Sequence, residues 1–365
     1  MNRQNKKLNG AAGLLALLLI LALGGILSAC SDSETQDDPT TGQAGGETAA
    51  SVADSSAQAL PVVGVLLYDE SDTYISLVCE SLVKSFAGKA ELIIRYADGD
   101  QLTQNEQLED LLKKPVNALV FNLVDVQAAA NIVDRIKKSG IPVVLFNREP
   151  DMSSIKTYDR ARFVGTALND AGILQGDLIY KLWNEHPEYD RNQDGQVQYV
   201  MIQAATNNPE SVIRTEYSVK RAVELGLTMS QLGDTYMCNW SEELAREAMR
   251  LALIRIEGEV ELVIANSDAM ALGAIAALAE KGYNTGDGGK FIPVVGVDAT
   301  PQAVEAIKKG IMSATVRQDA MGMGKITADM TLNAIAGKDF LADTNLEYDE
   351  SGVAVRLSFT PYYGE

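Results

Sequence analysis

Short runs of apolar, mostly β-branched residues recur along the chain from about residue 60 onward. Runs of this kind, bounded by polar or turn-forming residues, are typical of strands buried on both faces of a sheet. The pattern predicts strands at residues 62–68, 91–96, 118–122, 143–147, 163–165, 197–203, 262–266, 294–298 and 313–316.

Longer stretches separate these runs, and their apolar residues recur every three or four positions, as in amphipathic helices. Helices are predicted at residues 74–86, 105–113, 127–138, 170–184, 210–225, 241–256, 269–281 and 301–309. Strands that alternate with helices indicate an α/β fold built from repeated βα units around parallel sheets. Because the folded part holds ~300 residues, more than one core usually contains, we expect two lobes.

Polar side chains gather where the predicted strands end. They are Asp72, Asn122, Asn147, Asn266, Asp268 and Asp298. In open parallel sheets, ligands bind beyond the carboxyl ends of the strands, so this set predicts a ligand site there. Any single member could instead form a turn or cap the following helix, because Asn and Asp serve both purposes.

The first residues have the features of a targeting segment rather than of a folded element. A basic start precedes the apolar run 11–23, and Leu-Ser-Ala-Cys at residues 27–30 resembles a bacterial lipobox. That resemblance implies a signal peptide at residues 1–29 and lipidation of Cys30, which would tether the protein outside the cytoplasm. The alternative is a plain membrane anchor, since residues 10–29 nearly reach the ~20 residues that span a bilayer.

Residues 30–59 are rich in Ser, Thr, Asp, Glu, Gly and Ala, a composition that predicts a disordered linker behind the lipidated cysteine. The formal net charge of −19 argues against a nucleic-acid partner, because phosphate binding needs clustered Lys and Arg. Beyond Cys30 only Cys79 and Cys238 remain. They can be unpaired or form a bridge, and two positions do not decide between these alternatives.

A stretch rich in Asp, Asn and Gln has the spacing of a calcium-binding loop. Its position six is Gly195, where such a loop must turn sharply. The predicted ligands are the side chains of Asp190, Asn192, Asp194 and Gln198 and the backbone carbonyl of Gln196. Position twelve is Met201 rather than the usual bidentate Glu, so a structural Ca²⁺ needs a carboxylate from elsewhere. The alternative is a solvated turn before the next strand.

Catalytic motifs are scarce in this chain. The single histidine, His186, precedes Pro187 in a polar loop without a neighbouring nucleophile, which disfavours triad chemistry. The chain has no GxSxG, P-loop or CxxC motif. Paired carboxylates could still serve a glycosidase, so that class stays open, but we expect a binding protein rather than an enzyme.

Several motifs, in order along the chain, resemble the periplasmic galactose/glucose-binding protein family. They are VGVLLY at 63–68 followed by Asp72-Thr73-Tyr74, ALVFNLVD at 118–125, the calcium loop, VIANSDAM at 263–270 and IPVVGVDA at 292–299. The resemblance implies a type I periplasmic-binding-protein fold, a monomer with two doubly wound parallel-sheet lobes joined by three chain crossings. It assigns residues 61–140 and 320–353 to the first lobe and residues 142–318 and 355–365 to the second. It also implies that Glu261 completes the calcium shell.

The same resemblance implies a sugar site between the lobes. Its residues would be Asp72, Tyr74 and Asn122 of the first lobe and Asn208, Glu210, Arg214, Trp240, Ser267, Asp298 and Gln318 of the second. Tyr74 and Trp240 would stack on the two faces of the sugar ring. Four positions depart from the family pattern, with Asn208 for His, Glu210 for Asp, and Ser267 and Gln318 each for Asn. Galactose or glucose is therefore the leading expectation, and another hexose or a pentose stays open.

By this resemblance, the protein is the substrate-binding component of an ABC transporter, and its closed form docks on a membrane permease. A sugar-sensing ectodomain that serves a receptor or chemotaxis system is the rival interpretation, because the same clamp can serve both. A DNA-binding repressor of related fold is disfavoured by the export signal and by the lack of an amino-terminal helix-turn-helix segment.

Overall fold

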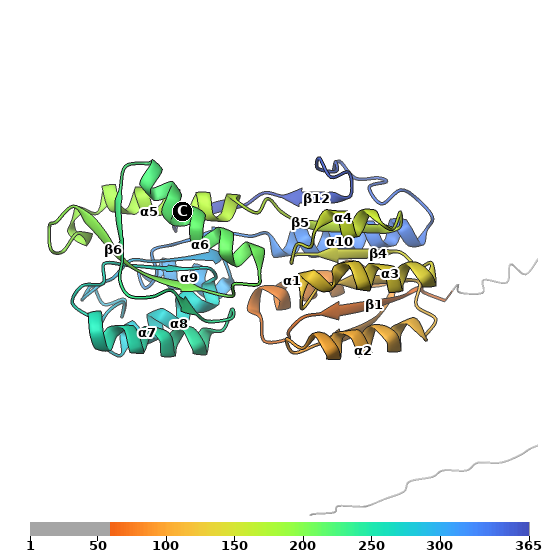
Figure 1. Ribbon diagram of the computed structural model, residues 1–365, viewed down its shortest axis with the longest axis horizontal. Helices are drawn as coiled ribbons and strands as arrows, with labels where there is room; N and C mark the ends of the chain where they lie inside the picture. Colours follow the sequence, from red (N-terminus) through yellow and green to blue (C-terminus); the bar gives the residue numbers. More distant parts are fainter. Residues whose placement is uncertain (1–58, 365) are drawn as a thin grey trace, which may run out of the picture. The chain divides into compact units, whose positions relative to one another are not determined.

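The computed structural model describes residues 59–364, which contain two sheets, each with helices on both faces (Figure 1). The two doubly wound α/β lobes expected from the sequence are therefore confirmed. The predicted signal peptide, Cys30 and residues 31–58 of the predicted linker lie outside the described residues. Among residues 59–364, no helix has the length and apolar character needed to cross a membrane.

The first lobe is built on a six-stranded sheet in which all paired strands are parallel. In sheet order, the strands are β12 (Ala354–Leu357), β5 (Ala161–Thr166), β4 (Val143–Phe146), β3 (Ala118–Phe121), β1 (Val62–Leu67) and β2 (Glu91–Tyr96). Helices α1 (Thr73–Phe86) and α10 (Ala320–Ile335) pack on one face. The other face is covered by α2 (Gln101–Leu112), α3 (Ala129–Ser139) and α4 (Met152–Lys156), with the short η1 (Val126–Ala128) ahead of α3.

The second lobe is built on a seven-stranded sheet. In sheet order, the strands are β13 (Thr360–Tyr362), β11 (Ala314–Arg317), β10 (Val294–Asp298), β9 (Leu262–Ala265), β6 (Gln196–Gln203) and β7 (Thr228–Gln231), and β8 (Tyr236–Met237) also pairs with β6. Only β13, at the edge, runs antiparallel to its neighbour. Helices α7 (Glu242–Ile256), α8 (Asp268–Ala279) and α9 (Pro301–Lys308) cover one face. Helices α5 (Asp170–Glu185) and α6 (Pro209–Glu224) cover the other, and η2 (Pro187–Tyr189) follows α5.

The chain crosses between the lobes three times, between β5 and α5, between β11 and α10, and between β12 and β13. The expected start of the second lobe at residue 142 is wrong, because β4 pairs with β3, β5 pairs with β4, and both therefore extend the first sheet. Strand β12 pairs in turn with β5, which carries the first lobe to residue 357 rather than 353. The three-crossing hinge is as expected, but its first crossing lies after Thr166.

Helix α10 leaves the second crossing and packs closely along α1. A Cβ atom added at Gly324 would lie 2.5 Å from Ser81 Cβ and 2.8 Å from the Val78 carbonyl oxygen, which is closer than such atoms approach. The close crossing of the two helices therefore requires glycine at position 324. This packing anchors the two helices that begin beside the candidate site described below.

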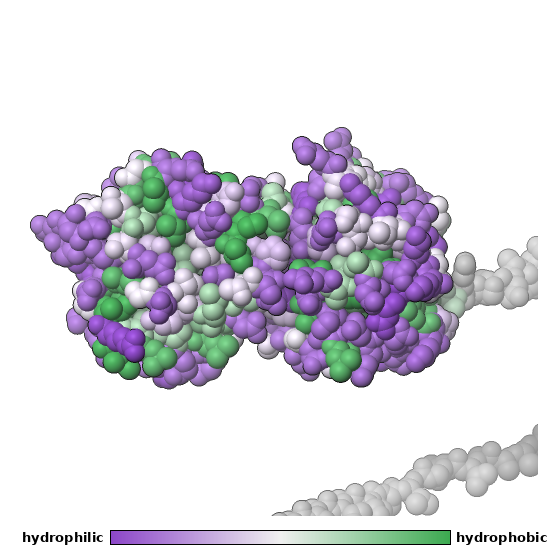
Figure 2. All heavy atoms as spheres, viewed as in Figure 1, coloured by the Kyte–Doolittle hydropathy of each residue, from purple (hydrophilic) through white to green (hydrophobic). Residues whose placement is uncertain are grey.

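The face of the described body that Figure 2 shows is mostly hydrophilic, and the hydrophobic residues on it appear in separate groups. Individual apolar side chains such as Leu102, Leu251 and Ile254 are well exposed. Leu251 and Ile254 lie three residues apart on one face of α7, and Leu102 lies on α2 of the other lobe; single exposed apolar side chains of this kind do not by themselves mark an interface.

Candidate functional site

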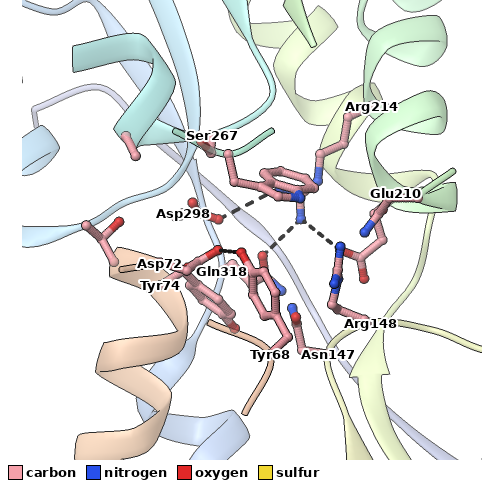
Figure 3. Close-up of a pocket in the computed structure, with 14 residues that line it drawn as sticks. Tyr68, Asp72, Tyr74, Asn147, Arg148, Glu210, Arg214, Ser267, Asp298 and Gln318 are labelled. Atoms are coloured by element: carbon pink, nitrogen blue, oxygen red, sulfur yellow. Dashed lines mark hydrogen bonds and ion pairs between the residues drawn. The ribbon is translucent and has the colours of Figure 1, made fainter. Parts of the chain in front are cut away.

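Strand ends and helix starts from both lobes surround one cavity (Figure 3). Its lining residues are Tyr68, Asp72, Thr73, Tyr74, Asn147 and Arg148 of the first lobe and Asn208, Glu210, Arg214, Trp240, Ser267, Ala269, Asp298 and Gln318 of the second lobe and its crossing. The cavity has a volume of about 30 Å³, roughly the space of one water molecule, so the walls from the two lobes lie close together in this structure. All the predicted sugar-binding residues except Asn122 thus line one cavity, although their part in sugar binding stays a prediction.

The first-lobe wall is organised around Asp72, which caps the start of α1. Its Oδ1 accepts a hydrogen bond of 2.9 Å from the Ile75 backbone nitrogen, and its Oδ2 accepts one from the Tyr68 hydroxyl. Tyr74 follows in the first turn of α1, and its hydroxyl donates to Met323 Sδ of α10 at 3.5 Å. The aromatic ring that faces the cavity is therefore held from behind by the packing of α10.

The second-lobe wall is organised around Arg214, which is 3% exposed. Its Nη1 donates to the Asn266 carbonyl oxygen at 2.9 Å, and its Nη2 donates to Gln318 Oε1 at 3.0 Å. Two carboxylates lie near the same guanidinium, Glu210 at 3.7 Å and Asp298 at 3.9 Å (Figure 3). Arg214 thereby connects α6, the end of β10 and the second crossing around one positive charge.

Three helices begin at the cavity, and each has a polar cap that lines it. Asp72 caps α1, Asn208 caps α6 and Ser267 caps α8, in each case by accepting a bond from a backbone N–H in the first turn. Capping explains why these residue types follow the strands here. The amino-terminal ends of the helices carry partial positive charge, which favours electron-rich oxygen atoms in the cavity.

The cavity crowds carboxylates together away from water. Burial raises the pKa of Asp72, Glu210 and Asp298, and it does so most strongly at Asp298, where Asp268, Asp72 and Glu210 add like-charge repulsion. The positive charge of Arg214 opposes this rise at Glu210 and Asp298. Ionised carboxylates in this site are therefore poorly solvated, which costs free energy. Hydrogen-bond donors from a ligand would reduce that desolvation cost.

Backbone conformations that are uncommon for side-chain-bearing residues also gather at the cavity. The φ angle is 63° at Asn147, 63° at Trp240 and 122° at Asp298. Such conformations cost on the order of 1–3 kcal/mol each and persist where the surroundings enforce them, often at binding sites. They aim these three side chains at the common space.

Asn122, which was expected to bind sugar, lies one layer behind the cavity wall. Its Oδ1 accepts from the Tyr68 backbone nitrogen at 3.4 Å, and its Nδ2 donates to the Phe146 carbonyl oxygen at 3.2 Å and to Asn147 Oδ1 at 3.3 Å. These contacts join the carboxyl ends of β1, β3 and β4. Asn122 therefore supports the lining residues Tyr68 and Asn147.

Some of the polar residues predicted at strand ends line the cavity, and others make contacts behind its wall. Asn147 lines the cavity, whereas Asn266 and Asp268 do not. Asn266 Oδ1 accepts from the Ala204 backbone and Ser211 Oγ, and Asp268 accepts from Thr315 Oγ1 at 2.6 Å. Burial raises the pKa of Asp268 to about 7. Both residues brace the second sheet beneath the site.

Four further lining residues were not expected. They are Tyr68, Thr73, Arg148 and Ala269. Thr73 and Ala269 directly follow or adjoin predicted site residues, so proximity along the chain could have identified them. Tyr68 at the end of a strand has the same signal as the polar strand ends, but its aromatic character assigns it equally well to the core.

The residues of the candidate calcium loop are linked by hydrogen bonds, with the Asn192 and Gln198 side-chain amides both donating to Asp194 Oδ2. Glu261, which is distant in sequence, reaches the loop and accepts from the Arg191 backbone nitrogen at 2.8 Å and from the Gln198 backbone nitrogen at 3.3 Å. Gln198 Oε1 is buried and accepts no hydrogen bond from the described residues. Such an orphaned oxygen suits a cation. No group of three or more His, Cys, Asp or Glu side chains in residues 59–364 is arranged to hold a metal, so the fit rests on amide oxygens as well.

The two cysteines of the described body are both free and buried. Cys79 lies on α1 of the first lobe, and Cys238 lies after β8 of the second, so they belong to different lobes. Burial raises the pKa of the Cys238 thiol to about 11. The unpaired alternative from the sequence is the one that the structure shows.

Comparison with known proteins places this chain among sugar-binding proteins. It is 34% identical over 306 residues to the D-galactose/methyl-galactoside binding periplasmic protein of Haemophilus influenzae, which covers 83% of this chain and 88% of that protein. It is 25% identical over 270 residues to the D-xylose-binding periplasmic protein of Escherichia coli, with 73% and 76% covered. These relatives are binding proteins rather than enzymes.

Solved structures of solute-binding proteins have the same fold as this chain. An ABC transporter solute-binding protein from Bacillus halodurans with bound myo-inositol superimposes with a TM-score of 0.68 at 26% identity, covering 83% of this chain and 94% of that one. A periplasmic solute-binding protein from Actinobacillus succinogenes with bound D-allose gives a TM-score of 0.69 at 18% identity, which supports the fold alone. Residues 63–339 match the family model described as a periplasmic binding protein domain, and the chain belongs to that family.

Proposed function

We propose that this protein is the extracytoplasmic, lipid-anchored substrate-binding component of an ABC transporter, and that it captures one monosaccharide, galactose or glucose, by closure of its lobes. The observation that carries the proposal is the cavity walled by both lobes, where aromatic rings and charged side chains face the same space. The galactose-binding relative, at 34% identity, supports the choice of sugar.

The lining chemistry suits a pyranose. A sugar ring has apolar C–H faces, which aromatic side chains cover, and a rim of hydroxyl groups, which carboxylates and guanidinium groups bind in fixed directions. Tyr74 and Trp240 supply rings from opposite lobes. Asp72, Asp298 and Arg214 supply the rim with charged acceptors and a charged donor.

Gln318 offers a specific donor for a ligand oxygen. Its Oε1 accepts from Arg214 Nη2, which sets the direction of the amide. Its Nε2 is buried and donates to no described residue. A buried donor without a partner costs ~1–3 kcal/mol, so a sugar hydroxyl oxygen at this position would recover that free energy on binding. The longer Gln318 side chain, in place of the family's Asn, makes this contact a candidate determinant of which sugar is accepted.

Closure of the lobes follows from the division of these groups. Asp72 and Tyr74 belong to the first lobe, and Arg214, Trp240 and Asp298 belong to the second. A sugar can contact both sets only when the lobes are close, so it binds the closed form more tightly and shifts the population toward it. A closed form populated mainly with bound sugar is what a permease needs to distinguish loaded from empty protein.

We also propose a structural Ca²⁺ at the loop that includes Asp190 and Gln198. Asp190, Asn192, Asp194 and Gln198 would supply side-chain oxygens, Gln196 its backbone carbonyl and Glu261 the completing carboxylate. The orphaned Gln198 Oε1 supports this ligand set. A bound cation would neutralise the loop carboxylates and tie the start of β6 to the start of β9, which stabilises the second lobe.

Calorimetric titration of the purified protein with galactose, glucose, ribose, xylose and arabinose, in the presence of calcium, tests the proposal. We expect tight one-to-one binding of galactose or glucose. Binding of another sugar alone would keep the clamp and make Asn208, Glu210, Ser267 and Gln318 the determinants of specificity. If none of the sugars binds, the assignment as a transporter component is wrong.

A further inference from the structure

Tyr68 is a cavity residue whose hydroxyl is already engaged. It donates to Asp72 Oδ2, while Asp72 Oδ1 accepts from the Ile75 backbone nitrogen at 2.9 Å. Both oxygens of this carboxylate are therefore held, one by the start of α1 and one by Tyr68. The lone pairs that remain on Asp72 point in fixed directions.

Tyr68 is itself held in place by its neighbours. The guanidinium carbon of Arg148 lies 4.3 Å from the centre of the Tyr68 ring, a cation–π contact. Arg148 Nη1 donates to the carbonyl oxygens of Leu123 at 3.1 Å and Val124 at 2.6 Å, so its position is set by the backbone after β3. Figure 3 shows Tyr68 and Arg148 on the same wall of the cavity, with Asp72 beside the Tyr68 hydroxyl.

We propose that Tyr68 is a positioning residue, clamped by Arg148, that orients the Asp72 carboxylate to accept one ligand hydroxyl in a fixed direction. This inference rests on the proposed function for its ligand but not for its geometry. A carboxylate fixed at both oxygens accepts a hydroxyl from one direction well and from others poorly, so the unit would discriminate between sugars that differ in one hydroxyl's orientation.

The electrostatics of the wall agree with this role. Burial raises the pKa of Asp72, and the Tyr68 hydroxyl and the Arg148 charge both oppose that rise. Across the cavity, the charge of Asp72 raises the pKa of Asp298, so each of these two carboxylates disfavours ionisation of the other. Tyr68 and Arg148 therefore help to keep Asp72 an ionised acceptor.

A double-mutant cycle tests whether Tyr68 acts through Asp72. We expect Y68F to weaken binding of galactose or glucose, whichever the wild type binds more tightly, by about tenfold, because Asp72 loses the bond that fixes the direction of its carboxylate. In the D72N background, which retains a capping side chain for α1, Y68F should weaken binding less than twofold further. Equal losses in both backgrounds, or no loss in Y68F, would overturn the inference.

The matched control is Y158F. Tyr158 lies in the first-lobe core, where its hydroxyl donates to the Ile141 carbonyl oxygen at 2.9 Å, away from the cavity lining. We expect this variant to bind sugar as the wild type does. If Y158F weakened binding as much as Y68F, the effect would come from general loosening of the lobe, and the positioning role would be wrong.

A measurement without sugar separates this inference from the proposed function. Carboxyl ¹³C NMR titration of the unliganded protein should show that the pKa of Asp72 is higher in Y68F than in the wild type, since a bond that favours the ionised form is gone. An unchanged Asp72 titration would refute the positioning unit whether or not sugars bind. Failure of the wild type to bind any sugar would instead refute the proposed function and leave the titration to decide this point.

Discussion

Replacing Asp298 should have opposite effects on two quantities, because its carboxylate is expected to strengthen sugar binding and to lower the stability of the folded protein at neutral pH. Replacement by Asn removes the charge, keeps the size, and suits a residue whose φ angle is positive. If Asp298 accepts even one sugar hydroxyl, the lost charge-assisted bond of ~1.5–3 kcal/mol weakens binding by about 10- to 100-fold. Calorimetric titration with the preferred sugar measures this loss directly.

The effect on stability should have the opposite sign at neutral pH. Burial and neighbouring carboxylates raise the pKa of Asp298 well above 3.8, so the folded protein binds its proton more tightly than the unfolded chain does. The contribution of this group to stability is therefore complete below about pH 4 and is lost as pH rises through the folded pKa. The variant lacks that loss, so its Tm at pH 7 should be no lower than that of the wild type, and any advantage should shrink toward pH 4.

Arg214 keeps most of its partners when Asp298 is replaced by Asn. In the variant it loses a carboxylate at 3.9 Å but keeps Glu210 at 3.7 Å and two hydrogen bonds. Asp151→Asn is the matched control, because Asp151 caps α4 away from the cavity and its hydrogen bonds lower its pKa. Unchanged sugar affinity in the Asp298 variant, or a Tm at pH 7 clearly below wild type, would refute the argument.

Three further predictions concern the calcium loop, the anchor and the helix crossing. Removal of Ca²⁺ by a chelator should lower the Tm of the wild type but not of Glu261→Gln, and equal shifts in both would exclude Glu261 as a ligand. Cys30→Ala should abolish incorporation of labelled lipid in cells and release the protein from the membrane fraction, whereas retention would favour a plain anchor. Gly324→Ala should cost ~1–3 kcal/mol of unfolding free energy by forcing a methyl group against Ser81, while Gly258→Ala, where the added atom meets nothing within 4 Å, should be near neutral; equal effects would contradict the close crossing.

Most of the fold could be predicted because buried parallel strands carry continuous apolar runs. Helix α10 was not predicted, because its apolar residues do not form a single stripe along the helix. It packs against both α1 and the sheet, so its apolar residues surround much of the helix, and its two glycines, Gly322 and Gly324, weaken the signal further. Strand β13 was missed because Thr-Pro-Tyr is short and contains a proline, which only an edge strand tolerates.

Only some of the site residues could be predicted from their place along the chain. Asp72 could be identified from its polar side chain between a strand and a helix, whereas Ser267 was expected only from the family resemblance, and the structure shows that both cap helices. Whether a side chain lines the cavity or stands behind it depends on tertiary contacts, and Asn122 illustrates this, since its amide is used to join three strands. The predicted position of the lobe boundary was wrong because no local sequence pattern shows that β4 pairs with β3 and β5 pairs with β4.

The most direct test of the account is a crystal structure of the protein with the sugar that it binds most tightly. We expect one sugar ring between Tyr74 and Trp240, with hydroxyl groups bonded to Asp72 and Asp298 from opposite lobes and an oxygen within reach of Gln318 Nε2. A sugar bound elsewhere, or held by one lobe alone, would contradict capture by closure.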